Sequence, residues 1–204
     1  TYNDCGISNP STLDILIHQA PVTAGAILGS VNPCTGAINT YSVQSQSGLS
    51  YTWNLPQGWV LQSGQGTASI TAVVGNTQGT ISVIPSNFCG QGDTSTLVVN
   101  PMSIPVLSGT IAGTTDTCSG AIGVPYSISP QPDVYYNWNV PNGWAITFGQ
   151  GTPTIIVTTG QLGGWLWVIP SNGCGTGTGD SINIAITQPP AQPSAIYGNP
   201  TCCL

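Results

Sequence analysis

Apolar and polar residues alternate with a period of two over short stretches of the chain, a pattern typical of β-strands with one buried face. These stretches are rich in β-branched and aromatic residues, and turns rich in Gly, Pro and Asn separate them. They lie at 41–44, 51–55, 59–62, 68–74, 80–84 and 96–99, with a further strand expected near 25–28. About seven strands in roughly 85 residues predict an all-β fold built from tandem β-sandwiches.

The pattern then occurs a second time, 84–85 residues later. The stretch "ISVIPSNFCG" at 81–90 returns as "LWVIPSNGCG" at 166–175, and "GQGT" at 64–67 returns at 149–152. Single positions agree as well: Tyr51, Trp53, Pro56, Gly58 and Trp59 correspond to Tyr136, Trp138, Pro141, Gly143 and Trp144. This degree of self-similarity at a fixed period indicates tandem repeats.

Both ends of the chain contain fragments of the same repeat. "NDCG" at 3–6 aligns with "NFCG" at 87–90, and "GNPTC" at 198–202 aligns with "SVNPC" at 30–34. We therefore expect residues 1–20 to be the end of a preceding repeat, 21–104 and 105–189 to be two repeats, and 190–204 to start a following one. The chain would then be a window on a longer array.

The alternation also predicts which aromatic side chains are buried. Trp53 and Trp138 fall in phase with the inward side chains of their strands, which predicts core positions under the sandwich. Trp59 and Trp144 follow a Pro-x-Gly turn, and we expect them to cover the edge of the core.

Trp165 and Trp167 fall on the opposite phase, because Leu166 between them is in phase with the core. The first repeat carries Thr and Ser at these two positions, and Tyr135 likewise replaces a Ser. We predict a surface aromatic patch of Tyr135, Trp165 and Trp167, which only the second repeat displays. Exposed aromatic side chains mark either an interface with protein or the platform of a sugar site, and both interpretations stay open.

Composition excludes several classes of partner. The 204 residues contain no Lys, no Arg and six acidic residues, for a formal net charge of −6. Binding to nucleic acid or to an anionic membrane surface depends on cationic side chains, so neither is expected. No apolar run approaches the roughly 20 residues that span a bilayer, and membrane insertion is not expected either.

The sequence offers no site for catalysis, a metal or a cofactor. The only histidine, His18, stands alone near a repeat junction, and the acidic residues are scattered rather than paired. The stretch "GTGTGDSI" at 175–182 resembles a single copy of a calcium-binding nonapeptide, but that motif needs tandem copies. We expect a chain without catalytic residues, without metal and without cofactor.

Seven cysteines without a CxxC motif favour disulfides in an oxidising compartment over zinc. Two connectivities stay open. Cysteines could pair within a repeat, as Cys34–Cys89 and Cys118–Cys174, or between adjacent repeats, as Cys34–Cys174. In the second scheme Cys5 and Cys89 pair with a preceding repeat, Cys118 and Cys202 pair with a following one, and Cys203 is left over.

The repeated motifs resemble those of a known family. The order of "YSV", "YTW", "P-x-GW", "GQGT" and "SN-x-CG" is similar to the PKD-like, immunoglobulin-like repeats of large secreted Bacteroidota proteins. Such repeats occur in proteins exported by the type IX system, including the giant adhesins of gliding flavobacteria. The resemblance implies a non-catalytic module at the cell surface. It also draws attention to Asp180-Ser181-Ile182, which resembles the O-glycosylation acceptor of that phylum, at Ser181.

These observations favour a structural and adhesive segment of a long extracellular filament or adhesin. Its expected partners are adjacent repeats of the same chain, other copies in a filament, and surface glycans. One alternative is a carbohydrate-binding appendage of a secreted enzyme. The other is a self-assembling extracellular fibre, because strands without Lys offer poor protection against edge pairing.

Overall fold

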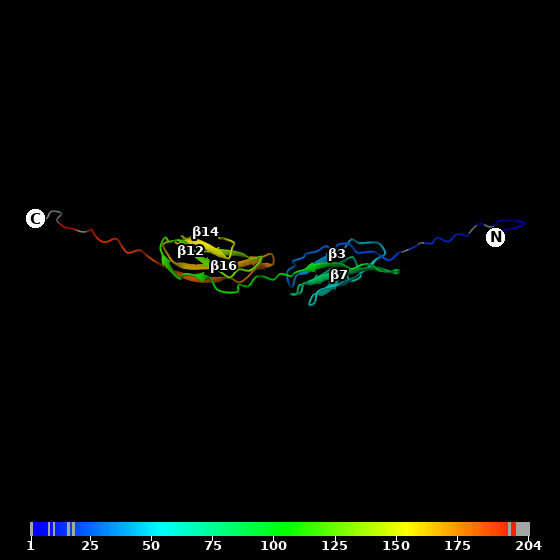
Figure 1. Cartoon of the computed structure of the whole chain (residues 1–204), viewed down its shortest axis with the longest axis horizontal. Coiled ribbons are helices and arrows are strands. Elements are labelled where there is room, and N and C mark those ends of the chain that lie inside the picture. Colours follow the sequence, from blue (N-terminus) through cyan, green and yellow to red (C-terminus); the bar gives the residue numbers. More distant parts are fainter. Residues whose placement is uncertain are drawn as a thin grey trace. The chain divides into compact units, whose positions relative to one another are not determined.

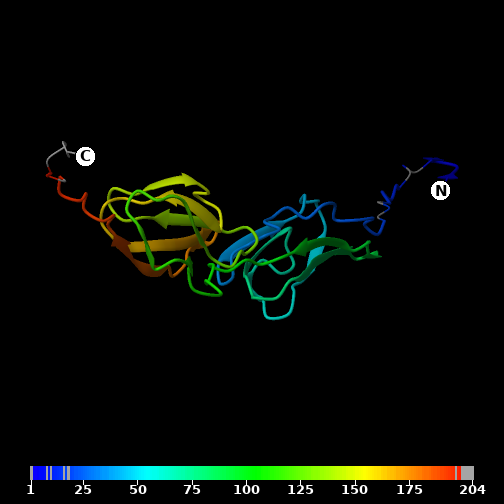
Figure 2. The ribbon, with the colours of Figure 1, turned by 60° about the vertical axis from the view of Figure 1, so that its left-hand side comes forward.

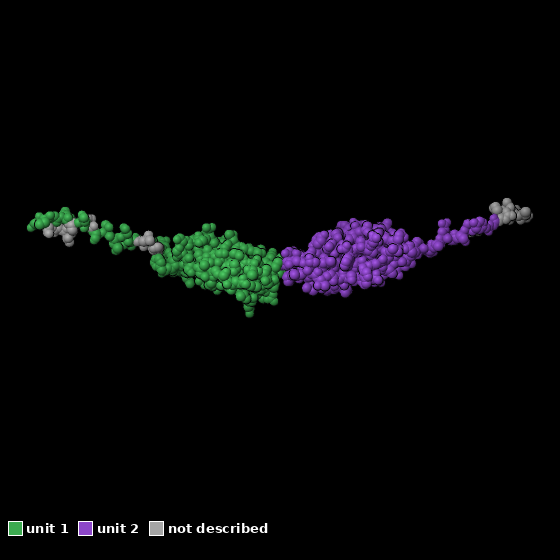
Figure 3. Space-filling view, turned by 180° about the vertical axis from the view of Figure 1, so that it is seen from behind, with its two compact units in different colours: residues 1–102 green, residues 103–204 purple. Residues whose placement is uncertain are grey.

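The computed structural model describes residues 2–7, 9, 11–15, 17, 19–195 and 197–198. It divides into two compact units, Thr1–Met102 and Ser103–Leu204 (Figure 3). All regular secondary structure in the described residues is β-strand, which confirms the predicted all-β class. Within this part of the chain there is accordingly no helix long and apolar enough to cross a membrane.

The first unit is a sandwich of two antiparallel sheets, seen as two layers in Figures 1 and 2. One sheet has the order β3 (Ile38–Ser42), β6 (Ser69–Val73), β5 (Val60–Ser63). In the other, β4 (Ser50–Asn54) pairs with β7 (Gly79–Asn87), which also pairs with β8 (Gly90–Gln91) and β9 (Ser95–Val99). The strand expected near 25–28 is reduced to an isolated bridge between Leu28 and Ser42.

The second unit repeats this plan with two additional short strands. One sheet has the order β10 (Ala112–Gly113), β12 (Ile122–Ser127), β15 (Thr154–Thr158), β14 (Ala145–Phe148). The other has the order β11 (Asp116–Cys118), β18 (Asp180–Thr187), β16 (Gly164–Asn172), β13 (Tyr135–Asn139), and β17 (Gly175–Thr176) also pairs with β16. The pairing of β11 with β18 is parallel.

The first and last strand regions of both units run parallel. In the second unit β11 and β18 pair from Asp116–Ala185 to Cys118–Thr187. In the first unit the corresponding contact is a parallel bridge between Cys34 and Met102. There the Thr35 amide donates to the Met102 carbonyl at 2.8 Å, and the Met102 amide donates to the Pro33 carbonyl at 2.8 Å.

The cores lie between the two sheets and use equivalent residues. Trp53 and Trp138 are almost fully buried, and Trp59 and Trp144 retain 8% exposure each, so the predictions of core and core-edge positions are confirmed. The other fully buried side chains in each core come from the alternating inward positions of both sheets. In the first unit these include Tyr41, Tyr51, Ile70, Ile81 and Val83, and in the second Tyr126, Tyr136, Ile155, Leu166 and Val168.

The N-terminal residues form a small hairpin of β1 (Tyr2–Asn3) and β2 (Gly6–Ile7). Its register pairs Asn3 with Gly6, as Asn87 pairs with Gly90 and Asn172 with Gly175. The three copies of the Asn-x-Cys-Gly motif therefore form the same turn. The assignment of residues 1–20 to a preceding repeat stays a prediction.

Candidate functional site

β4 of the first unit and β13 of the second are edge strands, and the "GQGT" loop holds each of them in place. In the second unit the Gln150 amide nitrogen donates to the Trp138 carbonyl at 2.9 Å, and its Oε1 accepts from the Trp138 amide at 3.0 Å. The Trp138 indole nitrogen donates to the Thr152 carbonyl at 2.8 Å. Gln65 and Thr67 make the same three bonds with Trp53. The glutamine thus pairs with the strand edge as a neighbouring backbone would.

Beside this strand, β16 exposes two tryptophans on the outer face of the sheet. Trp165 is 61% exposed and Trp167 is 50% exposed, whereas Leu166 and Val168 are fully buried. Because successive side chains of a strand point to opposite faces, burial of one pair requires exposure of the other. The equivalent outward side chains of β7 are Thr80 and Ser82.

The two indoles line a groove of about 560 Å³ together with Asn139, Val140 and Ser181. The register explains this grouping, since Trp167 pairs with Asn139 of β13 on one side and with Ser181 of β18 on the other. The groove therefore combines two aromatic faces with one amide and one hydroxyl, and none of its lining residues is charged.

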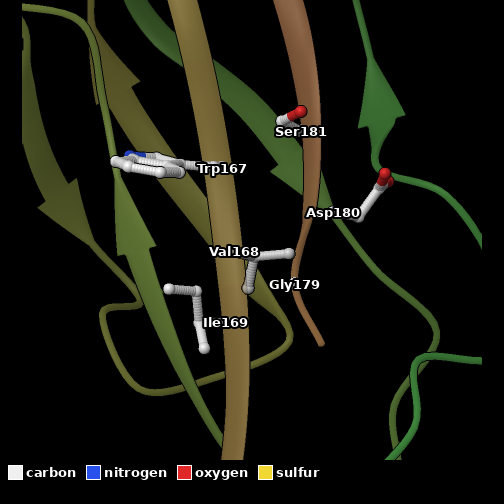
Figure 4. Close-up of a pocket in the computed structure, with 6 residues that line it drawn as sticks. All are labelled: Trp167, Val168, Ile169, Gly179, Asp180 and Ser181. Carbon is white, nitrogen blue, oxygen red and sulfur yellow. The ribbon is translucent and has the colours of Figure 1, made fainter. Parts of the chain in front are cut away.

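A second hollow of about 260 Å³ shares Trp167 and Ser181 and extends over Gly179 and Asp180. In Figure 4 the Trp167 indole extends from β16 away from β18, whereas the Asp180 carboxyl points in the opposite direction. That carboxylate accepts a hydrogen bond from the Ile111 amide at 2.8 Å. Asp180 thus fastens the segment before β10 to β18 and does not face the indoles.

Tyr135 is 53% exposed but lies apart from the tryptophans. It pairs with Ser171, four residues along β16 from Trp167, a separation of about 13 Å at the usual rise of a strand. Its ring packs on the "GQGT" loop, because a Cβ added to Gly151 would lie 2.4 Å from the ring. Of the three predicted patch residues, the structure brings Trp165 and Trp167 together and leaves Tyr135 at the other end of β13.

Among the described residues no group of three or more His, Cys, Asp or Glu side chains could hold a metal ion. The carboxylate of the calcium-like stretch at 175–182 is the one that accepts from the Ile111 amide. His18 lies outside the described residues.

Comparison with known families decides what kind of domain this is. A model of the PKD-like domain matches residues 20–99 and again residues 104–184. The chain belongs to the PKD-like domain family. The two matches coincide with the two sandwiches, so each PKD-like domain is one repeat of the sequence.

Two solved structures of titin domains are similar to this chain in fold. An I-band fragment of titin matches with 14% identity and a TM-score of 0.51, over 80% of this chain and 66% of that one. A three-domain titin variant matches with 14% identity and a TM-score of 0.52, over 81% and 67%. The Escherichia coli adhesin FdeC matches with 14% identity and a TM-score of 0.40, over 83% and 66%.

At such identities the titin similarity shows an immunoglobulin-like fold and nothing about activity. The chain spans about two thirds of the length of these structures. A search of curated proteins found no match in sequence.

The cysteines of the PKD-like domains are not equivalent to one another. Cys34 and Cys174 each belong to a disulfide, whereas Cys118, the counterpart of Cys34 in the second repeat, is free and exposed. A pairing of Cys118 with Cys174 within the second repeat is therefore absent from the structure. Cys5 and Cys89 lie in the turns of their hairpins, and Cys202 and Cys203 lie outside the described residues.

Three residues of this face were not anticipated from the sequence. Asn139 and Val140 enter the groove only through the register of β13 against β16, which the alternation of the strands does not determine. The role of Gln150 had a visible signal, because "GQGT" is repeated without change between repeats that differ at most other loop positions.

Proposed function

We propose that this chain is a non-catalytic structural and adhesive segment of a long extracellular cell-surface filament or adhesin. One observation carries the proposal: the same sandwich, without Lys or Arg, occurs twice in tandem, each copy with its first and last strand regions paired in parallel. Such a unit is suited to transmitting tension along a chain.

The reason lies in the direction of the load. When a unit is pulled by its ends, the first strand of a parallel pair is drawn backwards and the last strand forwards, along the same axis. The hydrogen bonds between β11 and β18 are then strained in shear and must break together, rather than one at a time. In the first unit the bonds of Met102 with Pro33 and Thr35 take this role.

Composition and cysteines support an extracellular setting. Without Lys or Arg the chain offers no cleavage site to proteases of trypsin specificity. Disulfide-bonded Cys34 and Cys174 suit an oxidising environment. The sequence motifs further support a parent protein of the type IX-secreted, gliding-adhesin kind in Bacteroidota. Other copies of the chain and surface glycans remain the proposed partners, and Ser181, which is exposed, the proposed O-glycosylation site.

We also propose that Cys34 pairs with Cys174 and so links adjacent repeats covalently. Its support is that both cysteines belong to a disulfide while Cys118 is free, which removes the within-repeat scheme for the second repeat. Peptide mapping without reductant tests the pairing. A cross-linked peptide containing Cys34 and Cys174 is expected, whereas one containing Cys34 and Cys89 would contradict it.

The exposed tryptophans favour a second candidate, a carbohydrate-binding appendage of a secreted enzyme. The two functions predict different parent polypeptides. Antibodies raised against the chain should label filaments on intact source cells in immunogold electron microscopy, and should precipitate a polypeptide made mainly of such repeats. Recovery of a parent with glycoside hydrolase activity, and no label on the cells, would replace the structural function with the appendage.

A further inference from the structure

We propose that the groove at Trp165 and Trp167 is a binding site for a neutral glycan chain, whose sugar rings stack on the two indoles. This inference gives the adhesive part of the proposed function a ligand class, and it rests on that part of the proposed function alone. Its test reads binding directly, so its failure would leave the structural role of the repeats untouched.

The first argument is the chemistry of the lining. A pyranose has an apolar face of C–H groups and a rim of hydroxyls, so it matches a flat aromatic face bordered by polar atoms. Here Trp165 and Trp167 supply the aromatic faces, while the Asn139 amide and the Ser181 hydroxyl supply donors and acceptors beside them. Small-molecule sites generally combine a mostly apolar wall with a few placed polar groups in this way.

The second argument is spacing. Trp165 and Trp167 are two positions apart on one strand, which places them about 6.6 Å apart along β16. Two indoles in a row along a straight strand can accept consecutive rings of an extended oligosaccharide. The groove of about 560 Å³ lies within the range of ligand pockets in general.

The third argument is size, which disfavours a folded protein as the occupant. A stable protein interface takes about 800 Å² and 20–30 residues from each partner. The groove has five lining residues, and the outward positions around it include the polar, exposed side chains of Asn137 and Asn183 as well as the half-buried Ile169. A small aromatic patch bordered largely by amides and hydroxyls fits a ligand that needs hydrogen bonds at its rim.

The fourth argument is charge, which selects among glycans. The chain has no cationic Lys or Arg to pair with a carboxylate or sulfate, and the groove itself has no charged lining residue. The adjoining hollow adds only the carboxylate of Asp180, which supplies no positive charge for an anionic sugar. The expected ligand is therefore uncharged.

The first repeat supplies an internal comparison. It has Asn54, Leu55 and Thr96 at the positions of Asn139, Val140 and Ser181, so the polar border of the groove is present in both units. At the positions of the two tryptophans, however, the first repeat has Thr80 and Ser82, which carry no aromatic ring. The inference therefore assigns recognition to the two indoles, and predicts that the first repeat does not bind.

The test uses the 204-residue chain on an array of neutral and acidic oligosaccharides that includes glucans, mannans, galactans, chito-oligosaccharides, uronates and sulfated glycans. We expect binding to at least one neutral class. The variant W165T/W167S, which installs the residues of the first repeat, should lose at least tenfold in affinity. Tyr135→Ser is the matched control, because it removes an exposed aromatic ring from the same sheet outside the groove.

A gain-of-function variant distinguishes loss of the binding site from misfolding of the variant. T80W/S82W places the two indoles on the first repeat, and combined with W165T/W167S it should restore binding to the same glycans. Four results would each overturn the proposal. The variant W165T/W167S could keep its binding, or Tyr135→Ser could lose as much binding as W165T/W167S does. The wild-type chain could bind acidic glycans alone, or bind no glycan. Concentration-dependent dimers in sedimentation that W165T/W167S abolishes would also overturn it, because they would make a second copy of the chain the occupant.

Discussion

At the scale of single residues, one buried tyrosine in each unit anchors the segment ahead of its strand. The Tyr41 hydroxyl donates to the Ser30 carbonyl, and the Tyr126 hydroxyl donates to the Thr114 carbonyl, both at 3.1 Å. Each ring packs on a glycine: a Cβ added to Gly29 or Gly113 would lie 2.2 Å from it. Burial raises the pKa of both phenols above their ordinary value.

This shift predicts alkaline unfolding. Because the unfolded chain has the ordinary tyrosine pKa of about 10, it ionises first as pH rises. The contribution of these tyrosines to stability is complete below pH 10 and is lost as pH rises from there through the raised pKa of the folded state. The double variant Tyr41→Phe/Tyr126→Phe should lose about 1 kcal/mol per unit at neutral pH, from the two hydrogen bonds, and should unfold less steeply above pH 10.

Urea unfolding followed by Trp fluorescence at several pH values between 8 and 12 measures this effect. The control is Tyr135→Phe, which changes an exposed tyrosine and should reproduce the wild-type profile. If the double variant and the wild-type chain lose stability with the same slope, ionisation of the two buried phenols does not drive the alkaline transition.

The sequence pattern was sufficient to predict burial or exposure for residues whose position depends on one strand alone. The alternation placed Trp53 and Trp138 inside and Trp165 and Trp167 outside, because it needs no knowledge of the neighbouring strand. It grouped Tyr135 with the tryptophans, since both strands share a face of the sheet. The separation of about 13 Å along the strands follows from the register, which the pattern does not contain.

At the scale of elements, side chains complete the edges of the sheets. The edge of β4 is covered by the "GQGT" loop, through Gln65 on Trp53 and through paired backbone bonds between Tyr51 and Gly66. An exposed strand edge is a template for pairing with other chains. These bonds occupy part of that edge, so less of it is open to pairing with another chain than the absence of Lys from the strands suggests.

Removing one of these glutamines should destabilise its own unit. Gln65→Ala leaves the Trp53 amide and carbonyl without partners, and we expect a loss of about 1–3 kcal/mol in the first unit. Hydrogen exchange locates the effect, because the Trp53 amide should lose its protection while the Trp138 amide keeps it. Gln57→Ala, an exposed glutamine in the nearby turn, is the control. A loss no larger than that of Gln57→Ala would show that the glutamine bridge contributes little.

The strands that sequence analysis missed are short and have no apolar alternation. β11 consists of Asp116, Thr117 and Cys118, which present no apolar alternation, and its pairing with β18 comes from the topology of the sandwich. The strand expected near 25–28 had an apolar pattern but remains a single bridge at Leu28. Whether a terminal strand of this kind forms depends on the strand it pairs with more than on its own residues.

At the scale of the molecule, the tandem order of PKD-like domains is what the sequence determined best. A period of 84–85 residues marks each sandwich, and the family matches and the two compact units follow it. The distinctive surface of the second domain rests on two substitutions in this shared plan. Two changes on one exposed face leave the core that the two domains share intact.

The central claim is that each PKD-like domain resists tension as a separate unit, and stretching the 204-residue chain by its ends in optical tweezers tests it most directly. In the presence of reductant we predict two discrete unfolding events, each releasing the extended length of about 80 residues, about 280 Å, less the length that the folded domain already spans. Without reductant the proposed Cys34–Cys174 bridge should shorten the total extension, and equal extensions in both conditions would contradict the bridge. Smooth extension under reductant, without discrete events, would contradict the tension-resisting role itself.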